Sequence, residues 1–264
     1  MSTSVLEYSP PLRFFRRRAV RRFIVAIGLL ALLVPAGYVG VSAWRKHQAE
    51  KEARRVAAPL LLVEGAYAGD VAKVKQALAD GASPNTVDRR ISCTMAPEAV
   101  LTEAVRARRI DVATVLLDAG ANPNTLCANS PIGRTILSYA TMMQDIEMVN
   151  LLLRKGADPN RDKGSAHTPL RWAGYLHNSA LLVLLLTSGA DAKDADENGR
   201  TLLHVLAWRG DVSDIELAIK YGALVNETDD EGKTPLDIAF REENRVVLKR
   251  AGGVVGAGID AEAD

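Results

Sequence analysis

The sequence is poor in cysteine, histidine and aromatic residues. Of its 264 residues, two are cysteine, four are histidine and 5% are aromatic. Two cysteines are too few for a disulfide-built scaffold and for a structural zinc site of the usual cysteine-rich kind. An apolar fraction of 48% excludes a chain that is disordered throughout. Because aromatic residues are scarce, any cluster of them is worth locating.

The chain also lacks a net charge of one sign, with 33 Lys and Arg against 32 Asp and Glu. This balance conceals two parts of different kind. Residues 1–55 carry a formal charge of +8, whereas residues 56–264 carry −7. Because most of the mass lies in the acidic part, nucleic-acid binding is not expected there.

One long stretch has no charged side chain. Phe23 to Trp44 reads FIVAIGLLALLVPAGYVGVSAW, which is 22 residues. As a helix it would be about 33 Å long, enough to cross a hydrocarbon core of about 30 Å. Tyr38 and Trp44 lie toward its C-terminal end, where aromatic rings favour the membrane interface. We therefore predict a single transmembrane helix over residues 23–44, after a basic tail at 1–22 and before a charged helical stalk at 45–58.

The orientation of this segment follows from the flanking charges. Six arginines lie in the 15 residues before it and five Lys or Arg in the 15 after it, so the positive-inside rule barely discriminates. Since six arginines would otherwise have to be translocated, we expect a cytoplasmic N-terminus and an extracytoplasmic domain. The Ala- and Arg-rich composition suggests a bacterial inner membrane, with the domain facing the periplasm.

A cleaved signal peptide is the alternative to the anchor. Val41-Ser42-Ala43 fits the small-residue cleavage pattern, so the chain would be secreted after cleavage near Ala43. The apolar run is longer than the usual signal core of about 7–15 residues, and this length favours the uncleaved anchor.

The remaining sequence repeats itself. The near copies are Gly81-Ala82-Ser83-Pro84-Asn85, Gly120-Ala121-Asn122-Pro123-Asn124 and Gly156-Ala157-Asp158-Pro159-Asn160, continued by Gly189-Ala190-Asp191 and Gly222-Ala223-Leu224-Val225-Asn226. The spacings between these glycines are 39, 36, 33 and 33 residues. Each glycine follows a helical pattern, as expected where a helix ends in a residue with a left-handed backbone conformation. Upstream of later copies lie Thr135-Ile136-Leu137, Thr168-Pro169-Leu170, Thr201-Leu202-Leu203-His204 and Thr234-Pro235-Leu236.

These residues resemble the ankyrin repeat, whose pattern is Gly-x-Thr-Pro-Leu-His-x-Ala, a helix, and then Leu-Leu-x-x-Gly-Ala-Asp. The resemblance implies an all-α fold, an ankyrin-repeat solenoid of helix-turn-helix units with short hairpin fingers, here preceded by one transmembrane helix. It covers residues 57–254, with repeats at about 57–85, 86–124, 125–160, 161–193, 194–226 and 227–254, and a flexible acidic tail at 255–264. Leu206 replaces the small residue of other copies (Ala104, Ala140, Ala173, Ala239), so different local packing is expected there.

In the ankyrin family the partner surface is the concave face, formed by a finger residue and by two residues late in each first helix. Finger positions here also include Glu98 and Lys233, and the last copy contributes Arg241 and Glu242. Exposed Tyr, Trp, Met and Arg are typical of binding hot spots. The alternative is that these residues pack as core, because helical spacing alone does not separate the two. The predicted partner-binding residues are Tyr67, Arg106, Arg134, Met142, Met143, His167, Tyr175, Leu176, Arg200 and Trp208.

The two cysteines lie in the two longest fingers. Adjacent fingers of an ankyrin stack lie side by side, so the resemblance implies a Cys93–Cys127 disulfide if the domain faces an oxidising compartment. Two unpaired loop thiols are the alternative, and the sequence leaves both open.

No pattern indicates catalysis, a cofactor or a metal. His167 and His177 are ten residues apart, unlike helical metal ligands, and His204 occupies the family's structural histidine position. The glycine-rich run from Gly252 to Gly258 lacks the phosphate-loop pattern. We therefore expect no enzyme, no cofactor, no small-molecule substrate and no nucleic acid. The expected function is a membrane-anchored module that recruits or restrains a protein partner. The alternative is an extracytoplasmic inhibitor or immunity partner of a toxin or enzyme.

Overall fold

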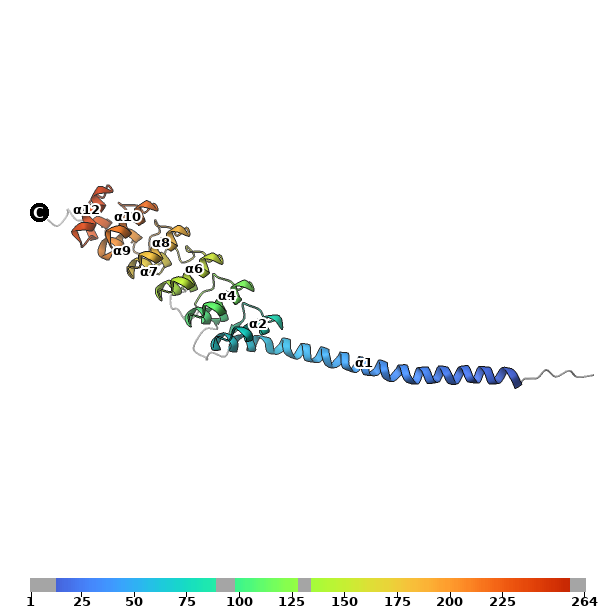
Figure 1. Ribbon diagram of the computed structural model, residues 1–264. Helices are drawn as coiled ribbons and strands as arrows, with labels where there is room; N and C mark the ends of the chain where they lie inside the picture. Colours follow the sequence, from blue (N-terminus) through green and yellow to red (C-terminus); the bar gives the residue numbers. More distant parts are fainter. Residues whose placement is uncertain (1–12, 89–97, 128–133, 257–264) are drawn as a thin grey trace, which may run out of the picture. The chain divides into compact units, whose positions relative to one another are not determined.

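The computed structural model describes residues 13–88, 98–127 and 134–256, and only the backbone of residues 13–40 and of Glu98 (Figure 1). The chain divides into two compact units, Met1–Val56 and Ala57–Asp264. The described part of the first unit belongs to helix α1 (Arg13–Ala68). No helix is both long and apolar enough to cross a membrane among the residues that were described. Most of the predicted span at 23–44 lies outside the described side chains, so the anchor stays a prediction.

The second unit is a series of helix pairs. After the end of α1 come α2 (Val71–Ala79), α3 (Val100–Arg106), α4 (Ile110–Asp118), α5 (Ile136–Met142), α6 (Ile146–Arg154), α7 (Pro169–Tyr175), α8 (Ser179–Thr187), α9 (Leu202–Arg209), α10 (Val212–Lys220), α11 (Pro235–Ile238) and α12 (Glu242–Arg250). Two-residue strands β1 (Val87–Asp88) and β2 (Glu98–Ala99) pair antiparallel, with Val87 opposite Ala99. We number the pairs as repeats 1 to 6, beginning with the end of α1 and α2. The predicted all-α series of helix pairs is confirmed.

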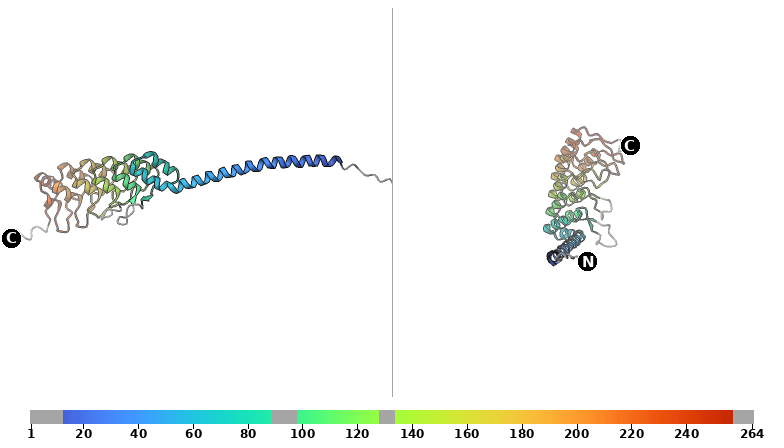
Figure 2. Two further views of the ribbon diagram at one scale, coloured as in Figure 1. Left: turned by 90° about the horizontal axis from the view of Figure 1, so that it is seen from below. Right: turned by 90° about the vertical axis from the view of Figure 1, so that its right-hand side faces the viewer.

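The helices of this unit form two layers (Figure 2). The first helices, α3, α5, α7, α9 and α11, pack on one another in order, and the second helices, α2, α4, α6, α8, α10 and α12, do the same. The core between the layers is mostly Leu, Val and Ala, and it includes Leu62 and Ala66 from the end of α1. Because each pair buries its apolar side only against its neighbours, the stack is the folding unit.

Particular residues mark the places where these helices begin and end. Thr135 and Thr168 are N-caps whose side chains accept hydrogen bonds from Ser138 N and Arg171 N. The second helices end in left-handed glycines, with φ of 91° at Gly120 and 93° at Gly222. A residue with a Cβ is strained at such angles, which explains why the glycines mark the period of the sequence.

An asparagine ladder joins the fingers, the segments that connect one repeat to the next. The asparagine amide donates to the glycine carbonyl of the following repeat, and its oxygen accepts from a backbone N–H there, at 2.7–3.4 Å. These asparagines are Asn85, Asn124, Asn160 and Asn226. In repeat 4 the corresponding residue is Lys193, so the described contacts between repeats 4 and 5 lack this pair of bonds.

The fourth residue of the Thr-x-Leu-x motif supplies a second connection to the following segment. Ser138 hydrogen-bonds Asp162 of repeat 4, His204 Nε2 donates to Lys233 O of repeat 6 at 3.0 Å, and Asp237 accepts from Gly256 N, after the last repeat, at 2.8 Å. In repeat 4 this residue is Arg171, which is only 1% exposed. Its guanidinium donates to Asp194 O at 2.8 Å and to Arg200 O at 2.6 Å, and it also bonds Ser165 O. Arg171 therefore joins repeats 4 and 5 where the ladder is interrupted.

Repeats 5 and 6 depart from the others at the turn between their helices. Leu206 is fully buried where other repeats have alanine, in the place where the sequence predicts different packing. Gly210 ends α9 in an extended conformation, at φ −69° and ψ 167°, whereas His177 in repeat 4 has φ 53°. In repeat 6, α11 ends after four residues. Phe240 lies outside the helix, and its backbone N–H donates to Ala207 O at 3.4 Å.

We predict that Arg171→Met destabilises the domain by about 3–5 kcal/mol, because it leaves three backbone carbonyls without their donor and removes the ion pair of 3.7 Å with the Asp194 carboxylate. Conversely, Lys193→Asn should restore the missing ladder bonds and raise the free energy of unfolding by about 0.5–1.5 kcal/mol. Denaturant unfolding of the full chain in detergent micelles measures both. Unchanged midpoints in both variants would contradict the assignment of this junction.

We also predict that the domain loses stability in mild acid. Burial lowers the pKa of His204 below its ordinary value of 6.5. Because Nδ1 accepts from Thr201 N at 3.0 Å, the neutral ring carries its proton on Nε2. The unfolded state then binds more protons, so the unfolding free energy falls as pH drops through about 6.5 toward the folded-state pKa. His204→Gln should flatten this slope between about pH 7.5 and 5.5; His167, whose pKa burial also lowers, accounts for a residual. An equal slope in both proteins argues against His204.

Candidate partner surface

The ten predicted partner-binding residues all lie at the ends of first helices or just before their N-caps, and we call them the partner surface. None of the ten is buried. The most exposed apolar members are Tyr67 at 42%, Met143 at 36%, Tyr175 at 41% and Trp208 at 47%. Arg134, His167 and Arg200 directly precede the N-cap threonines of α5, α7 and α9. Binding of a partner to these residues stays a prediction.

Several of these residues meet at Trp172, which the sequence analysis did not select. The Arg134 guanidinium carbon lies 5.0 Å from the Trp172 ring centroid, and the His167 ring stacks on the same ring at 5.7 Å. Tyr175 meets Trp172 edge-on at 6.4 Å. Burial, followed by the charge of Arg134, lowers the pKa of His167, so its ring is neutral near pH 7. The cluster holds Arg134 and Tyr175 in fixed positions through ring contacts and a cation–π interaction.

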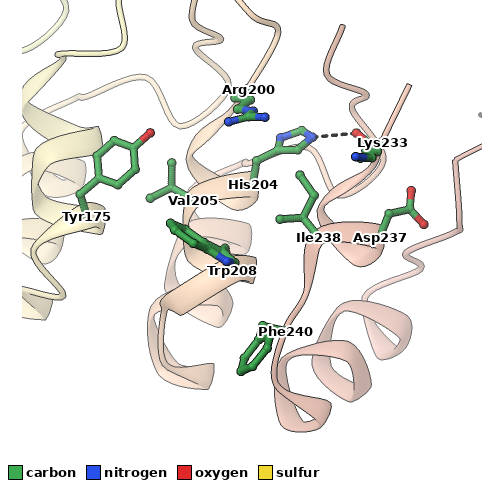
Figure 3. Close-up of a pocket in the computed structure, with 9 residues that line it drawn as sticks. All are labelled: Tyr175, Arg200, His204, Val205, Trp208, Lys233, Asp237, Ile238 and Phe240. Atoms are coloured by element: carbon green, nitrogen blue, oxygen red, sulfur yellow. Dashed lines mark hydrogen bonds between the residues drawn. The ribbon is translucent and has the colours of Figure 1, made fainter. Parts of the chain in front are cut away.

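A cavity of about 470 Å³ lies beside this cluster, across repeats 4 to 6 (Figure 3). Arg200 and Lys233 lie at its finger end, while Trp208 and Phe240 lie farther along the helices. Such a volume is within the usual range for ligand sites. Its lining residues are Tyr175, Arg200, His204, Val205, Trp208, Lys233, Asp237, Ile238 and Phe240.

Phe240 is the second residue that the sequence analysis missed, and it is 82% exposed. The repeat pattern places Arg241 and Glu242 late in the first helix of repeat 6, and this placement is wrong. Helix α11 ends at Ile238, Arg241 is the N-cap of α12 and Glu242 is its first residue. Since the Phe240 N–H bonds Ala207 O instead of continuing the helix, the phenyl ring takes the position at the cavity. A tertiary contact of this kind leaves no signal in the repeat pattern.

The two cations of the cavity differ in how they are paired. Lys233 Nζ donates to Glu231 at 2.7 Å, and this bond raises the pKa of Lys233. The Arg200 guanidinium lies 3.6 Å from Asp229 and 3.7 Å from Glu231, beyond ordinary hydrogen-bond length. Arg209 lies over the Trp208 ring at 4.3 Å.

The remaining predicted sites lie partly outside the described residues. Cys127 is buried, whereas Cys93 lies outside the described residues, so the disulfide stays a prediction. The side chain of Glu98 also lies outside them. Across residues 41–88, 99–127 and 134–256, no group of three or more His, Cys, Asp or Glu side chains is arranged to hold a metal ion.

Comparison with known proteins identifies the repeats. A family of ankyrin repeats (3 copies) matches residues 62–163, and one of ankyrin repeats (many copies) matches 178–239. The crystal structure of an ankyrin repeat domain from Acinetobacter baumannii AYE is similar, with a TM-score of 0.63 and 25% identity over 73% of this chain and 98% of that one. A search of curated proteins found no match. Because the two family matches together span more than half of the sequence, the chain belongs to the ankyrin-repeat family.

Proposed function

We propose that this ankyrin-repeat chain binds a protein partner through the partner surface and Phe240, and holds that partner at a membrane. Ankyrin repeats imply protein–protein interaction and are typically non-enzymatic binding modules. The observation that carries the proposal is the row of exposed Tyr67, Met143, Tyr175, Trp208 and Phe240, which lie at or just after the ends of the first helices of repeats 1, 3, 4, 5 and 6. In a chain with only 5% aromatic residues, four aromatic rings in one row form a candidate hot spot.

The energetics favour a role of these side chains in binding rather than in stabilising the fold. Exposed apolar side chains contribute little to folding, whereas covering one on binding contributes up to about 1.5–3 kcal/mol. Arg134 is fixed in place by Trp172, and Arg209 by Trp208, so less side-chain entropy is lost when a partner binds. The surface thus combines aromatic anchors with ordered arginines, a composition typical of interface centres.

The membrane part of the proposal is supported by the 22 uncharged residues at 23–44 between two arginine-rich flanks. An anchor confines the domain to a surface and raises its effective concentration toward a partner there, so that modest affinity suffices. With an extracytoplasmic domain, the partner would be another extracytoplasmic or membrane protein. If that partner proves to be a toxin or secreted enzyme, the module acts as its inhibitor or immunity partner.

Site-directed photo-crosslinking tests the binding function. A photoreactive residue at position 143 of the full chain, in membranes of the source cell, should give a discrete protein adduct, whereas one at Tyr221 on a second helix should not. Adding Trp208→Ala should reduce the adduct from position 143, because loss of a hot spot weakens binding about 30-fold. The matched control is Tyr221→Ala, since Tyr221 is similarly exposed at 39%. Equal adducts at 143 and 221, or unfolding by Trp208→Ala, would count against the proposal.

Topology is tested separately. A reporter that works only outside the cytoplasm, fused after Asp264, should be active, and its cytoplasmic counterpart should be inactive. In the same membranes Cys93 and Cys127 should resist thiol labelling until they are reduced. Activity of the cytoplasmic reporter together with two labelled thiols would reverse the orientation and remove the disulfide.

A further inference from the structure

We propose that the cavity of repeats 4 to 6 recognises a peptide segment in which a bulky apolar side chain lies beside a carboxylate. The carboxylate is either an Asp or Glu side chain or the C-terminus of a chain. This inference rests on the proposed function, and it gives the chemistry of the partner at one end of the partner surface.

The apolar half of the cavity is open and has no occupant from the described chain. Trp208 and Phe240 are 47% and 82% exposed although they line the same cavity, together with Tyr175, Val205 and Ile238 (Figure 3). The space of about 470 Å³ suits a bulky side chain with part of its flanking backbone. Aromatic walls favour aromatic or branched aliphatic groups, because covering these rings removes the most apolar surface from water.

The irregular end of α11 creates this half of the cavity. If α11 continued as the other first helices do, residue 240 would lie within the helix; instead it ends at Ile238, and the backbone leaves the helix at Ala239 with ψ 112°. The Phe240 N–H is held by Ala207 O, and Asn244 Nδ2 bonds both Ala207 O and Gly210 O. The fold therefore fixes the backbone of Phe240 while leaving its ring uncovered, which is the arrangement of a preformed contact for a ligand.

The polar half of the cavity contains the Arg200 guanidinium, which is held by ion pairs of 3.6 Å to Asp229 and 3.7 Å to Glu231. Glu231 is engaged by Lys233 at 2.7 Å, and Asp237 accepts bonds from Thr234 and Gly256. Arg200, whose side chain is 47% exposed, makes no side-chain hydrogen bond to the part of the chain that the structure describes. Its planar guanidinium can bind a carboxylate with two parallel bonds.

The surrounding charges select a singly charged group. Asp229, Glu231 and Asp237 outnumber the cations Arg200 and Lys233, so a dianion such as phosphate is repelled more strongly than a single carboxylate. A carboxylate brings one negative charge and matches the fork of Arg200. Because Arg200 and the aromatic rings line one cavity, the carboxylate and the apolar side chain of the ligand would lie close together.

Peptide selection on the full chain in detergent micelles tests this inference. Two random libraries are used, one displaying peptides with free C-termini and one displaying them internally. Enriched peptides should place Phe, Trp, Leu or Ile within two positions of Asp, Glu or the free terminus, and the library that enriches identifies the source of the carboxylate. Failure to enrich, or enrichment of basic or purely apolar peptides, would overturn the proposal.

A double-mutant cycle on the best peptide then tests the assigned contacts. Arg200→Gln alone, or replacement of the peptide's carboxylate by an amide alone, should weaken binding about tenfold to a hundredfold, and the two together no further. Phe240→Ala should weaken binding at least about tenfold without altering unfolding, because this ring is exposed. Arg154→Gln, an exposed arginine at the end of α6, is the matched control. Additive losses, or wild-type affinity in Arg200→Gln and Phe240→Ala, would refute the assignment.

These outcomes separate this inference from the proposed function. If the adduct from position 143 survives both Phe240→Ala and Arg200→Gln, protein binding stands and the cavity is not its recognition site. If the selected peptides bind through Arg200 and Phe240 while no adduct forms at position 143, the cavity is a peptide site and the broader partner surface is wrong.

Discussion

The structure depends on hydrogen bonds that pass from each finger to the next. The helices from α2 to α12 have only four to nine residues, and helices so short are marginal in water on their own. Successive repeats are joined by the asparagine ladder, by the fourth residue of the Thr-x-Leu-x motif, or by both. Where Lys193 interrupts the ladder, Arg171 supplies two bonds to repeat 5 and one within repeat 4 from a fully buried position. The same role is thus met by a hydroxyl, an imidazole, a guanidinium or a carboxylate, whichever reaches the next finger.

Because the core and the fingers hold the stack together, the side chains at the ends of the first helices are not needed for folding. The core is filled by Leu, Val and Ala between the layers, and the fingers are joined through backbone groups. Side chains at the helix ends therefore vary without loss of the stack, and this chain places Met143, Tyr175 and Trp208 there. Trp172 connects the two tasks, because it is partly buried and its ring holds Arg134 and Tyr175 in place.

The helix pairs can be predicted from the sequence because the backbone needs particular residues at the ends of the helices. The left-handed glycines, the capping threonines and the ladder asparagines recur because each satisfies a local constraint that few residues meet, so the helix pairs could be placed without a structure. Leu206 in an alanine position likewise indicates altered packing. Phe240 and Trp172 could not be found in this way, since the end of α11 depends on a bond to Ala207 and the ring cluster depends on packing between α5 and α7. Most of the span at 23–44, and Cys93, fall outside the described side chains.

The last two repeats are also where the core becomes polar. From repeat 3 to repeat 6, the third residue after the N-cap of the second helix is Met148, then Leu181, then Asp214, then Asn244, and all four are buried. Within the described residues, both carboxylate oxygens of Asp214 and the side-chain oxygen of Asn244 have no hydrogen-bond partner. Burying such atoms costs free energy that a Leu or Met would not. These unpaired buried atoms lie in repeats 5 and 6, which also line the cavity of about 470 Å³. A partner bound as proposed would cover Trp208 and Phe240 and would stabilise these two repeats by mass action.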